Sequence, residues 1–138
     1  MTAIRYSKDS VITVEQFRDV LVRSTLGERR PIDNAECLQG MLDHADIVAT
    51  AWHGDKLVGV SRALTDWHYA CYLADLAVDV AYQRSGVGKR LIDLTQRQLQ
   101  PLCKIILLAA PAANDYYPRI GFEHNPRAWI LEPNQRAV

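Results

Sequence analysis

The sequence predicts a single domain of the α/β (α+β) class, in which strand and helix patterns alternate along the chain. Its 138 residues fit one domain, and a chain of this length buries about 68% of its unfolded surface on folding. The clearest local feature is an apolar run that ends near Val80, followed by a short segment with Gly86 and Gly88 and then by apolar residues at helical spacing. That order indicates a strand, a tight glycine turn and a helix.

The remaining elements follow in order along the chain. Thr13, with Gln16 in the capping-box position, begins a first helix, and Asp33 begins a second one. The expected strands are residues 3–6, 47–52, 56–64, 69–80, 105–110, 122–123 and 128–131, and the second and third of them form a hairpin. A helix runs from the glycine turn to about Leu99, and a short one covers residues 112–120 and ends at Gly121.

The glycine turn has the chemistry of an anion site. The first amides of a helix have no carbonyl partner inside it, and the helix dipole places partial positive charge there. Gly86 and Gly88 carry no Cβ that would keep a ligand off this backbone, and Arg84, Lys89 and Arg90 add cations. The turn is therefore predicted to bind phosphate or pyrophosphate.

Two common phosphate loops do not fit the turn. A P-loop requires a glycine five residues before Gly88 and a Ser or Thr after the lysine, but the chain has Gln83 and Arg90 there. A dinucleotide-binding loop requires a third glycine three residues after Gly88, where the chain has Leu91. Both motifs are excluded.

The segment Gln83-Arg84-Ser85-Gly86-Val87-Gly88 resembles the acetyl-CoA signature of the GNAT superfamily of N-acetyltransferases, Gln/Arg-x-x-Gly-x-Gly/Ala after a long strand. The order of elements also resembles that family over essentially the whole chain. The resemblance implies a mixed, mainly antiparallel sheet of about six to seven strands, splayed at the middle and flanked by about four helices. It also implies one GNAT domain over residues 1–138.

The same resemblance implies an acetyl-CoA site. The pantetheine arm of the cosubstrate would pair with the backbone of Leu76, Ala77 and Val78, like an added strand. The pyrophosphate would bind the amides of the turn, which comprises Arg84, Ser85, Gly86, Val87, Gly88 and Lys89. An amide near Val78 would polarise the thioester carbonyl, and a primary amine would attack it directly in a ternary complex.

A second motif, Tyr116-Tyr117-Pro118-Arg119-Ile120-Gly121-Phe122, resembles the family's Phe/Leu-Tyr-x-x-x-Gly-Phe. The resemblance implies that Tyr117 points at the sulfur of coenzyme A and protonates the leaving thiolate; the alternative is a core tyrosine at the sheet edge. Pro118 departs from the pattern, since proline removes an amide donor and kinks a helix. Many relatives carry an Asn where this chain has Ala110 or Pro111, so that contact is not carried over.

The general base and the acceptor stay open. Asp75, His68, Glu28 or a water chain could take the proton of the attacking ammonium group. The acceptor could be a small cationic or aromatic amine or a polypeptide amine, and Arg29 with Arg30 could instead receive an acidic acceptor.

Composition narrows the function class. Sixteen basic residues balance sixteen acidic ones, so no net charge attracts nucleic acid or a membrane surface. Three widely spaced cysteines (Cys37, Cys71 and Cys103) are typical of reduced thiols. With no apolar leader or membrane-spanning run in the sequence, we expect a cytoplasmic enzyme without a metal, and a homodimer as is frequent in the family. A non-catalytic acyl-CoA sensor and an interaction domain that uses only the fold are the alternatives.

Overall fold

The computed structural model describes residues 3–138, which form two compact units, one ending at Leu108 and the other comprising Ala109–Val138. The first unit contains one sheet of five strands in the order β1-β2-β3-β4-β5. These strands are β1 (Arg5–Ser7), β2 (Ile47–His53), β3 (Lys56–Thr65), β4 (Ala70–Val78) and β5 (Lys104–Ile106). Neighbouring strands are antiparallel except β4 and β5, which are parallel. The predicted mixed, mainly antiparallel sheet is confirmed, with five strands in place of six to seven.

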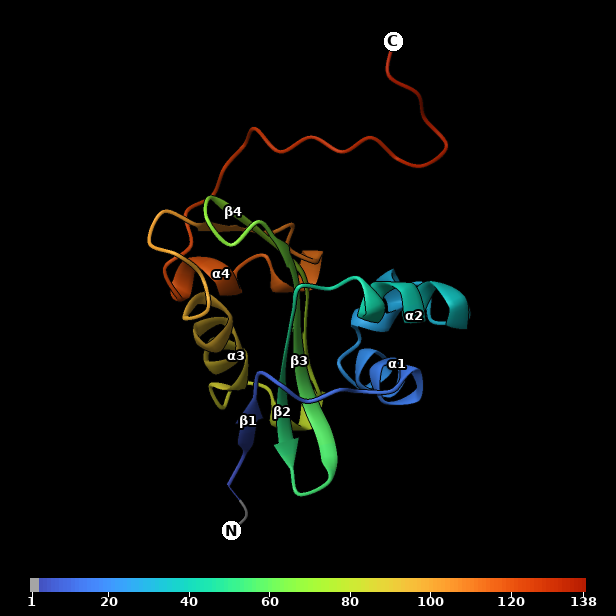
Figure 1. Cartoon of the computed structure of the whole chain (residues 1–138), viewed down its shortest axis with the longest axis vertical. Helices are drawn as coiled ribbons and strands as arrows, with labels where there is room; N and C mark the ends of the chain where they lie inside the picture. Colours follow the sequence, from blue (N-terminus) through green and yellow to red (C-terminus); the bar gives the residue numbers. More distant parts are fainter. Residues whose placement is uncertain (1–2) are drawn as a thin grey trace. The chain divides into compact units, whose positions relative to one another are not determined.

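Helices cover both faces of this sheet (Figure 1). On one face lie α1 (Val14–Arg23) and α2 (Ala35–Asp43), joined by a 3-10 turn, η1 (Leu26–Arg29). On the other face lies α3 (Val87–Gln96), which follows the 3-10 turn η2 (Val80–Tyr82). The buried core under α1 and α2 contains Phe17, Leu21, Leu38, Val60 and Ala77, whereas the core under α3 contains Ala49, Ala51, Val58, Val87 and Leu91.

The helix starts follow local capping chemistry. The predicted capping box of α1 is confirmed, because the Gln16 amide donates to Thr13 Oγ1 at 3.1 Å and the Thr13 amide donates to Gln16 Oε1 at 2.9 Å. The prediction that Asp33 caps α2 is wrong by one residue, since Asn34 accepts from the Cys37 amide. Asp and Asn cap equally well, so the pattern alone did not separate these neighbours.

The second unit has less regular structure than the sequence predicted. In place of one helix over 112–120 it contains a 3-10 turn, η3 (Pro111–Ala113), and the short helix α4 (Tyr116–Arg119). Pro118 lies in the first turn of α4, where a missing amide breaks no helical bond, and it prevents a longer helix that would begin earlier. Gly121 follows with φ of 101°, as expected for a residue after a helix end.

The predicted strands at 122–123 and 128–131 are absent, since residues 120–138 form no strand in the structure. The apolar run at Trp129, Ile130 and Leu131 is short and lies between Pro126 and Pro133. Proline cannot donate to a sheet ladder, and a segment this short forms a strand only when a partner strand holds it. The predicted strand at 105–110 is likewise reduced to Lys104–Ile106.

Candidate functional site

The glycine turn between β4 and α3 leaves backbone amides without a helical acceptor. Gly86 caps α3 with φ of 87°, and Arg84 is also left-handed with φ of 64°. The first bond of the helix runs from the Arg90 amide to the Gly86 carbonyl at 3.0 Å. The amides of Val87, Gly88 and Lys89 therefore precede any helical carbonyl that could accept from them. With Arg84, Ser85 and Gly86 exposed, this backbone is open to an anion.

The three basic side chains of the turn are not equivalent. Arg84 and Lys89 are exposed, and neither forms an ion pair within residues 3–138. Arg90 is already engaged, because its guanidinium carbon lies 4.5 Å from the centre of the Tyr6 ring. Two of the three predicted cations are thus available to a ligand at the turn.

Strand β4 has an unpaired edge directly before the turn. Its parallel pairing with β5 ends at Tyr72 and Ile106, while β4 itself continues to Val78. Within residues 3–138, no strand pairs with the remaining part of that edge. The sheet is therefore splayed at β4 and β5, as the sequence predicted.

The ladder fixes which backbone groups face this edge. The Asp79 amide donates to the Val58 carbonyl at 2.8 Å, and backbone groups of an antiparallel strand alternate between its two sides. Leu76 and Val78 therefore turn their backbone groups away from β3, whereas Ala77 turns its groups toward Val60, its partner in the register. Of the three predicted backbone contacts, Leu76 and Val78 offer groups to the open edge and Ala77 does not.

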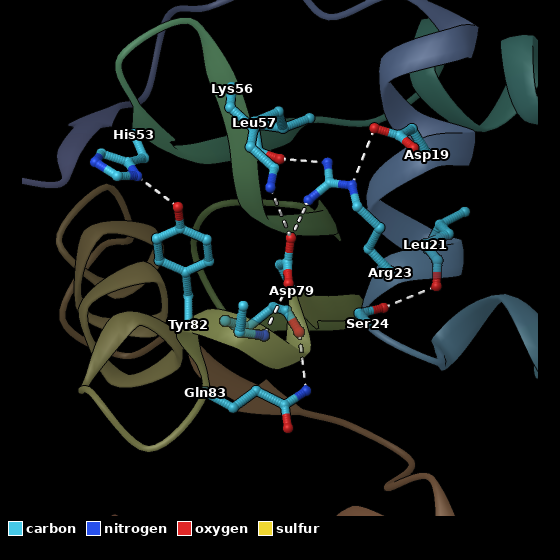
Figure 2. A network of polar contacts seen from close by, with 12 residues as sticks. Asp19, Leu21, Arg23, Ser24, His53, Lys56, Leu57, Asp79, Tyr82 and Gln83 are labelled. Atoms are coloured by element: carbon cyan, nitrogen blue, oxygen red, sulfur yellow. Dashed lines mark hydrogen bonds and ion pairs between the residues drawn. The ribbon is translucent and has the colours of Figure 1, made fainter.

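A polar network holds the turn in place (Figure 2). Asp79, at the end of β4, accepts from the Ala81 amide at 2.8 Å and pairs with Arg23 of α1 and Lys56 of β3. Arg23 also donates to the Leu57 carbonyl at 2.6 Å. Burial opposes the charge on Asp79, but the Ala81 amide and the Arg23 guanidinium outweigh it, so the pKa of Asp79 lies below the ordinary value. The start of the turn is thereby tied to both α1 and the β2–β3 hairpin.

Side chains of the turn itself add further ties. Gln83 Nε2 donates to the Val78 carbonyl at 2.9 Å, and Ser85 Oγ donates to the Tyr82 carbonyl at 2.5 Å. The Tyr82 hydroxyl and His53 Nδ1 lie 2.5 Å apart in a hydrogen bond (Figure 2). Gln83, the first residue of the signature, therefore shapes the backbone and occupies the Val78 carbonyl, which leaves the Val78 amide for a ligand.

Asp75 is poorly suited to act as a general base. Its carboxylate is 1% exposed and accepts from two arginines, Arg62 Nε at one oxygen and Arg30 Nε, 2.5 Å away, at the other. Arg30 Nη2 also donates to the Ala74 carbonyl at 2.9 Å. Each oxygen thus has a charged donor. Arg30, one of the two arginines considered as partners of an acidic acceptor, is already bonded to Asp75.

The other candidate bases lie at the surface. His68 is exposed in the turn between β3 and β4, where the Asp66 carboxylate accepts the amides of His68, Tyr69 and Ala70. These amides, those of Tyr69 and Ala70 above all, lower the pKa of Asp66. Glu28 is exposed in η1. The structure places neither side chain in a hydrogen bond that would orient it as a base.

Tyr117 belongs to an aromatic cluster of the second unit. Its ring centre lies 5.2 Å from that of Tyr116 and 5.4 Å from that of Phe122, both in edge-to-face geometry. Its carbonyl accepts from the amides of Ile120 and Phe122. The motif Tyr-x-x-x-Gly-Phe thus forms one local structure around Tyr117.

Sequence reasoning missed the pairs that position the site. Arg23 with Asp79, and Arg30 and Arg62 with Asp75, join residues 13 to 56 positions apart. One signal was present, because Asp79 stands where β4 ends and can cap η2. Its arginine partner could not be read from a single sequence, since only the fold brings α1 to that point.

A sheet splayed between its two parallel strands, with a glycine turn and a helix directly after the splayed strand, defines the GNAT class of acyltransferase folds. The family model described as acetyltransferase (GNAT) domain matches residues 44–124 of this chain. The chain therefore belongs to the GNAT acetyltransferase family.

Relatives of known sequence match parts of the chain. It is 36% identical over 73 residues to GCN5-related N-acetyltransferase 2, chloroplastic, of Arabidopsis thaliana. This alignment covers 51% of the chain and 28% of that protein. It is 34% identical over 73 residues to histone acetyltransferase TAP1 of Glycine max, covering 51% and 32%. The chain thus spans about a third of the length of these curated relatives.

Solved structures match the fold over nearly the whole chain. A GNAT-family acetyltransferase from Streptococcus pneumoniae superposes with a TM-score of 0.75 at 23% identity, covering 94% of this chain and 98% of that one. The aminoglycoside acetyltransferase AAC(6')-Iy, in complex with a bisubstrate analog of coenzyme A, superposes with a TM-score of 0.73 at 19% identity, covering 99% and 100%. At these identities the likeness shows the fold.

Three further properties concern membrane spans, cysteines and metal ligands. No helix within residues 3–138 is long and apolar enough to cross a membrane. All three cysteines are free thiols, with Cys71 buried and Cys37 exposed, and burial, followed by the neighbouring Cys103, raises the pKa of the Cys71 thiol. Across the same residues no group of three or more His, Cys, Asp or Glu side chains is placed to hold a metal ion.

Proposed function

We propose that this protein is an acetyl-CoA-dependent N-acetyltransferase that acts on a primary amine of a small molecule. The observation that carries the proposal is the continuity between the unpaired edge of β4 and the turn at Arg84–Lys89, whose last amides have no helical acceptor. The edge suits the amide-rich pantetheine arm, and the helix start suits the pyrophosphate. The residues present therefore fit the cosubstrate.

Acetyl-CoA supplies the activated acyl group, and the chain supplies position and charge. The amides of Val87, Gly88 and Lys89, with the Arg84 and Lys89 side chains, bind the pyrophosphate. The backbone of Leu76 and the amide of Val78 hold the arm along β4 and polarise the thioester carbonyl. Holding amine and thioester at contact distance removes much of the entropic barrier.

The acetyl group passes from sulfur to nitrogen in a single step. The neutral amine nitrogen forms a bond to the carbonyl carbon, the carbon–sulfur bond breaks, and the thiolate leaves with a proton from Tyr117. The attacking amine releases its proton to a water chain, since Asp75 is held by Arg30 and Arg62. We place the reaction in the cytoplasm, where the three free thiols would stay reduced.

A thermal-shift titration with acetyl-CoA, coenzyme A and ATP tests the cosubstrate site. Acetyl-CoA and coenzyme A should both stabilise the protein, by about 2.7 kcal/mol at a hundredfold excess over the dissociation constant, and ATP should do so weakly or not at all. No shift at millimolar ligand would refute the pyrophosphate site.

Gly86→Ala and Gly54→Ala are a matched pair for that titration. Both glycines have positive φ, and a Cβ at either position meets nothing within 4 Å. Each substitution should therefore cost about 1–2 kcal/mol of backbone strain, but only Gly86→Ala alters the turn that holds the anion. Gly86→Ala should weaken acetyl-CoA binding, while Gly54→Ala, in the β2–β3 hairpin, should leave it unchanged.

A non-catalytic acyl-CoA sensor is the second candidate, favoured by Ala110-Pro111 in place of the family's Asn and by Pro118 after Tyr117. Tyr117→Phe separates the two. In an enzyme the substitution should lower kcat, by about 10²-fold or more for loss of a proton donor, with coenzyme A binding retained. Wild-type protein that binds acetyl-CoA and releases no thiol with any amine would favour the sensor.

A further inference from the structure

The sheet face that carries α1 and α2 is not covered along its whole length. Three cross-strand pairs of β3 and β4 follow one another on this face: Val60 with Ala77, Arg62 with Asp75, and Leu64 with Tyr72. The first two pairs are buried, but Leu64 is 38% exposed and Tyr72 is 40% exposed. Ile106 of β5, which lies beside Tyr72 in the register, is 48% exposed. We call Leu64, Tyr72 and Ile106 the apolar row.

The apolar row lies where the sheet begins to splay. Tyr72 and Ile106 are the last paired residues of β4 and β5, and the open edge of β4 starts at the next residue. Between Tyr72 and Asp75 the register of β3 and β4 shifts by one residue, which leaves Ala74 as the extra residue of a β-bulge in β4. On the proposed function, the acyl-CoA arm lies along this edge at Leu76 and Val78, and Tyr72 of the apolar row lies farther from the glycine turn on the same strand.

The charges around the apolar row leave no acidic pocket. Both oxygens of Asp75 accept from arginines. The Asp46 carboxylate accepts a hydrogen bond from the Thr65 amide at 2.8 Å. The Asp66 carboxylate accepts hydrogen bonds from three backbone amides of the β3–β4 turn. Arg30 and Arg62 both pair with Asp75, and the Lys104 ammonium lies 3.4 Å from the centre of the Tyr69 ring.

We infer that the acceptor is a monoamine with an aromatic or aliphatic body that packs on the apolar row, and not a polycation. This inference rests on the proposed function and names its acceptor class. An exposed set of apolar side chains favours an apolar ligand. A polyamine, an aminoglycoside or a lysine-rich peptide requires several unpaired carboxylates, whereas here Asp75 pairs with two arginines and Asp46 and Asp66 accept hydrogen bonds from backbone amides.

An amine panel tests this acceptor class, with thiol release from acetyl-CoA as the readout. The panel contains phenethylamine and hexylamine as apolar monoamines, and spermidine, kanamycin and a lysine-rich peptide as polycations. Phenethylamine should be turned over with a kcat/KM about tenfold or more above the value for spermidine. Equal or faster turnover of the polycations would overturn the inference and leave acetyl transfer intact.

Substitution within the apolar row tests whether the acceptor amine binds there. Tyr72→Ala should lower kcat/KM for phenethylamine by about tenfold, the loss expected for one aromatic contact, with an unchanged KM for acetyl-CoA. Leu102→Ala is the matched control, since Leu102 is 79% exposed in the loop before β5. Tyr72→Phe should retain most of the activity, which separates loss of contact from misfolding.

Three results would count against the location or the whole scheme. Equal effects of Tyr72→Ala and Leu102→Ala would remove the apolar row from the acceptor site. A change of oligomeric mass in Tyr72→Ala, with unchanged amine kinetics, would show that a second copy covers this face instead. Absence of both acetyl-CoA stabilisation and thiol release would refute the proposed function, and this inference with it.

Discussion

Asp79 is the residue that ties the end of β4 to its surroundings. Its side chain is 5% exposed and bonds to the Ala81 amide, Arg23 and Lys56. An aspartate that loses its charge here leaves the Arg23 guanidinium with the exposed Asp19 as its remaining acidic partner. The start of the glycine turn thus depends on one carboxylate that contacts no ligand in the proposed mechanism.

Asp79→Asn tests this dependence through its effect on stability. The substitution keeps an oxygen for the Ala81 amide but removes the charge. It should cost about 2 kcal/mol of unfolding free energy, less than a fully buried pair would because the Arg23 side chain is 21% exposed. Chemical denaturation at pH 7 measures the difference. An equal stability of both proteins would show that the pair contributes nothing net.

The same variant should change the pH dependence of stability. The folded-state pKa of Asp79 lies below the ordinary value of 3.8, so folding favours the carboxylate. Its stabilisation is present above about pH 5 and is lost as the pH falls below 3.8 toward the folded-state pKa. The loss of stability between pH 5 and pH 3 should therefore be smaller in Asp79→Asn than in the wild type. Parallel denaturation curves at the two pH values measure it.

Among elements, α3 sits against the sheet with almost no spare room. A Cβ on Gly59 of β3 would lie 3.0 Å from Leu91 Cδ1 and 3.2 Å from Val87 Cγ1. Val87 is the first residue of α3, directly after the glycine turn. The close approach of strand and helix therefore helps to set the position of the turn.

The added methyl group in Gly59→Ala should displace the first turn of α3. Overpacking at the position should cost about 1–3 kcal/mol and should weaken acetyl-CoA binding in the thermal-shift titration. Gly40→Ala is the control, because a Cβ there meets nothing within 4 Å and the residue lies inside α2. Helix propensity predicts that this control is more stable than the wild type by about 0.5–1 kcal/mol. Unchanged binding in Gly59→Ala would separate the packing of α3 from the geometry of the turn.

Sequence patterns predicted elements where the signal was local. The capping box at Thr13 and Gln16, the hairpin of β2 and β3, and the order strand, glycine turn and helix all depend on residues close in the chain. The patterns failed where strand formation needs a distant partner, as at residues 128–131. They also could not show that the Asp75 carboxylate is paired with Arg30 and Arg62, because those contacts join residues 45 and 13 positions apart.

At the scale of the molecule, the second unit exposes a notable amount of apolar surface. Trp129 is 92% exposed, and Ile130 and Leu131 are each 61% exposed. The two units differ sharply in this respect, since the first has two helix-covered cores. Contiguous exposed apolar residues of this size are typical of protein–protein contacts.

A homodimer is therefore the expected state in solution, with Trp129, Ile130 and Leu131 in its interface. Light scattering should give about twice the chain mass of 15.6 kDa. Trp129→Asp with Ile130→Asp should shift the mass toward the monomer, because two carboxylates would have to be buried without partners. Leu102→Asp places the same charge on an isolated exposed leucine and should leave the dimer intact. A monomer mass for the wild type at micromolar concentration would contradict the dimer. The proposed cosubstrate site at residues 76–89 would then be judged by its own titration with acetyl-CoA.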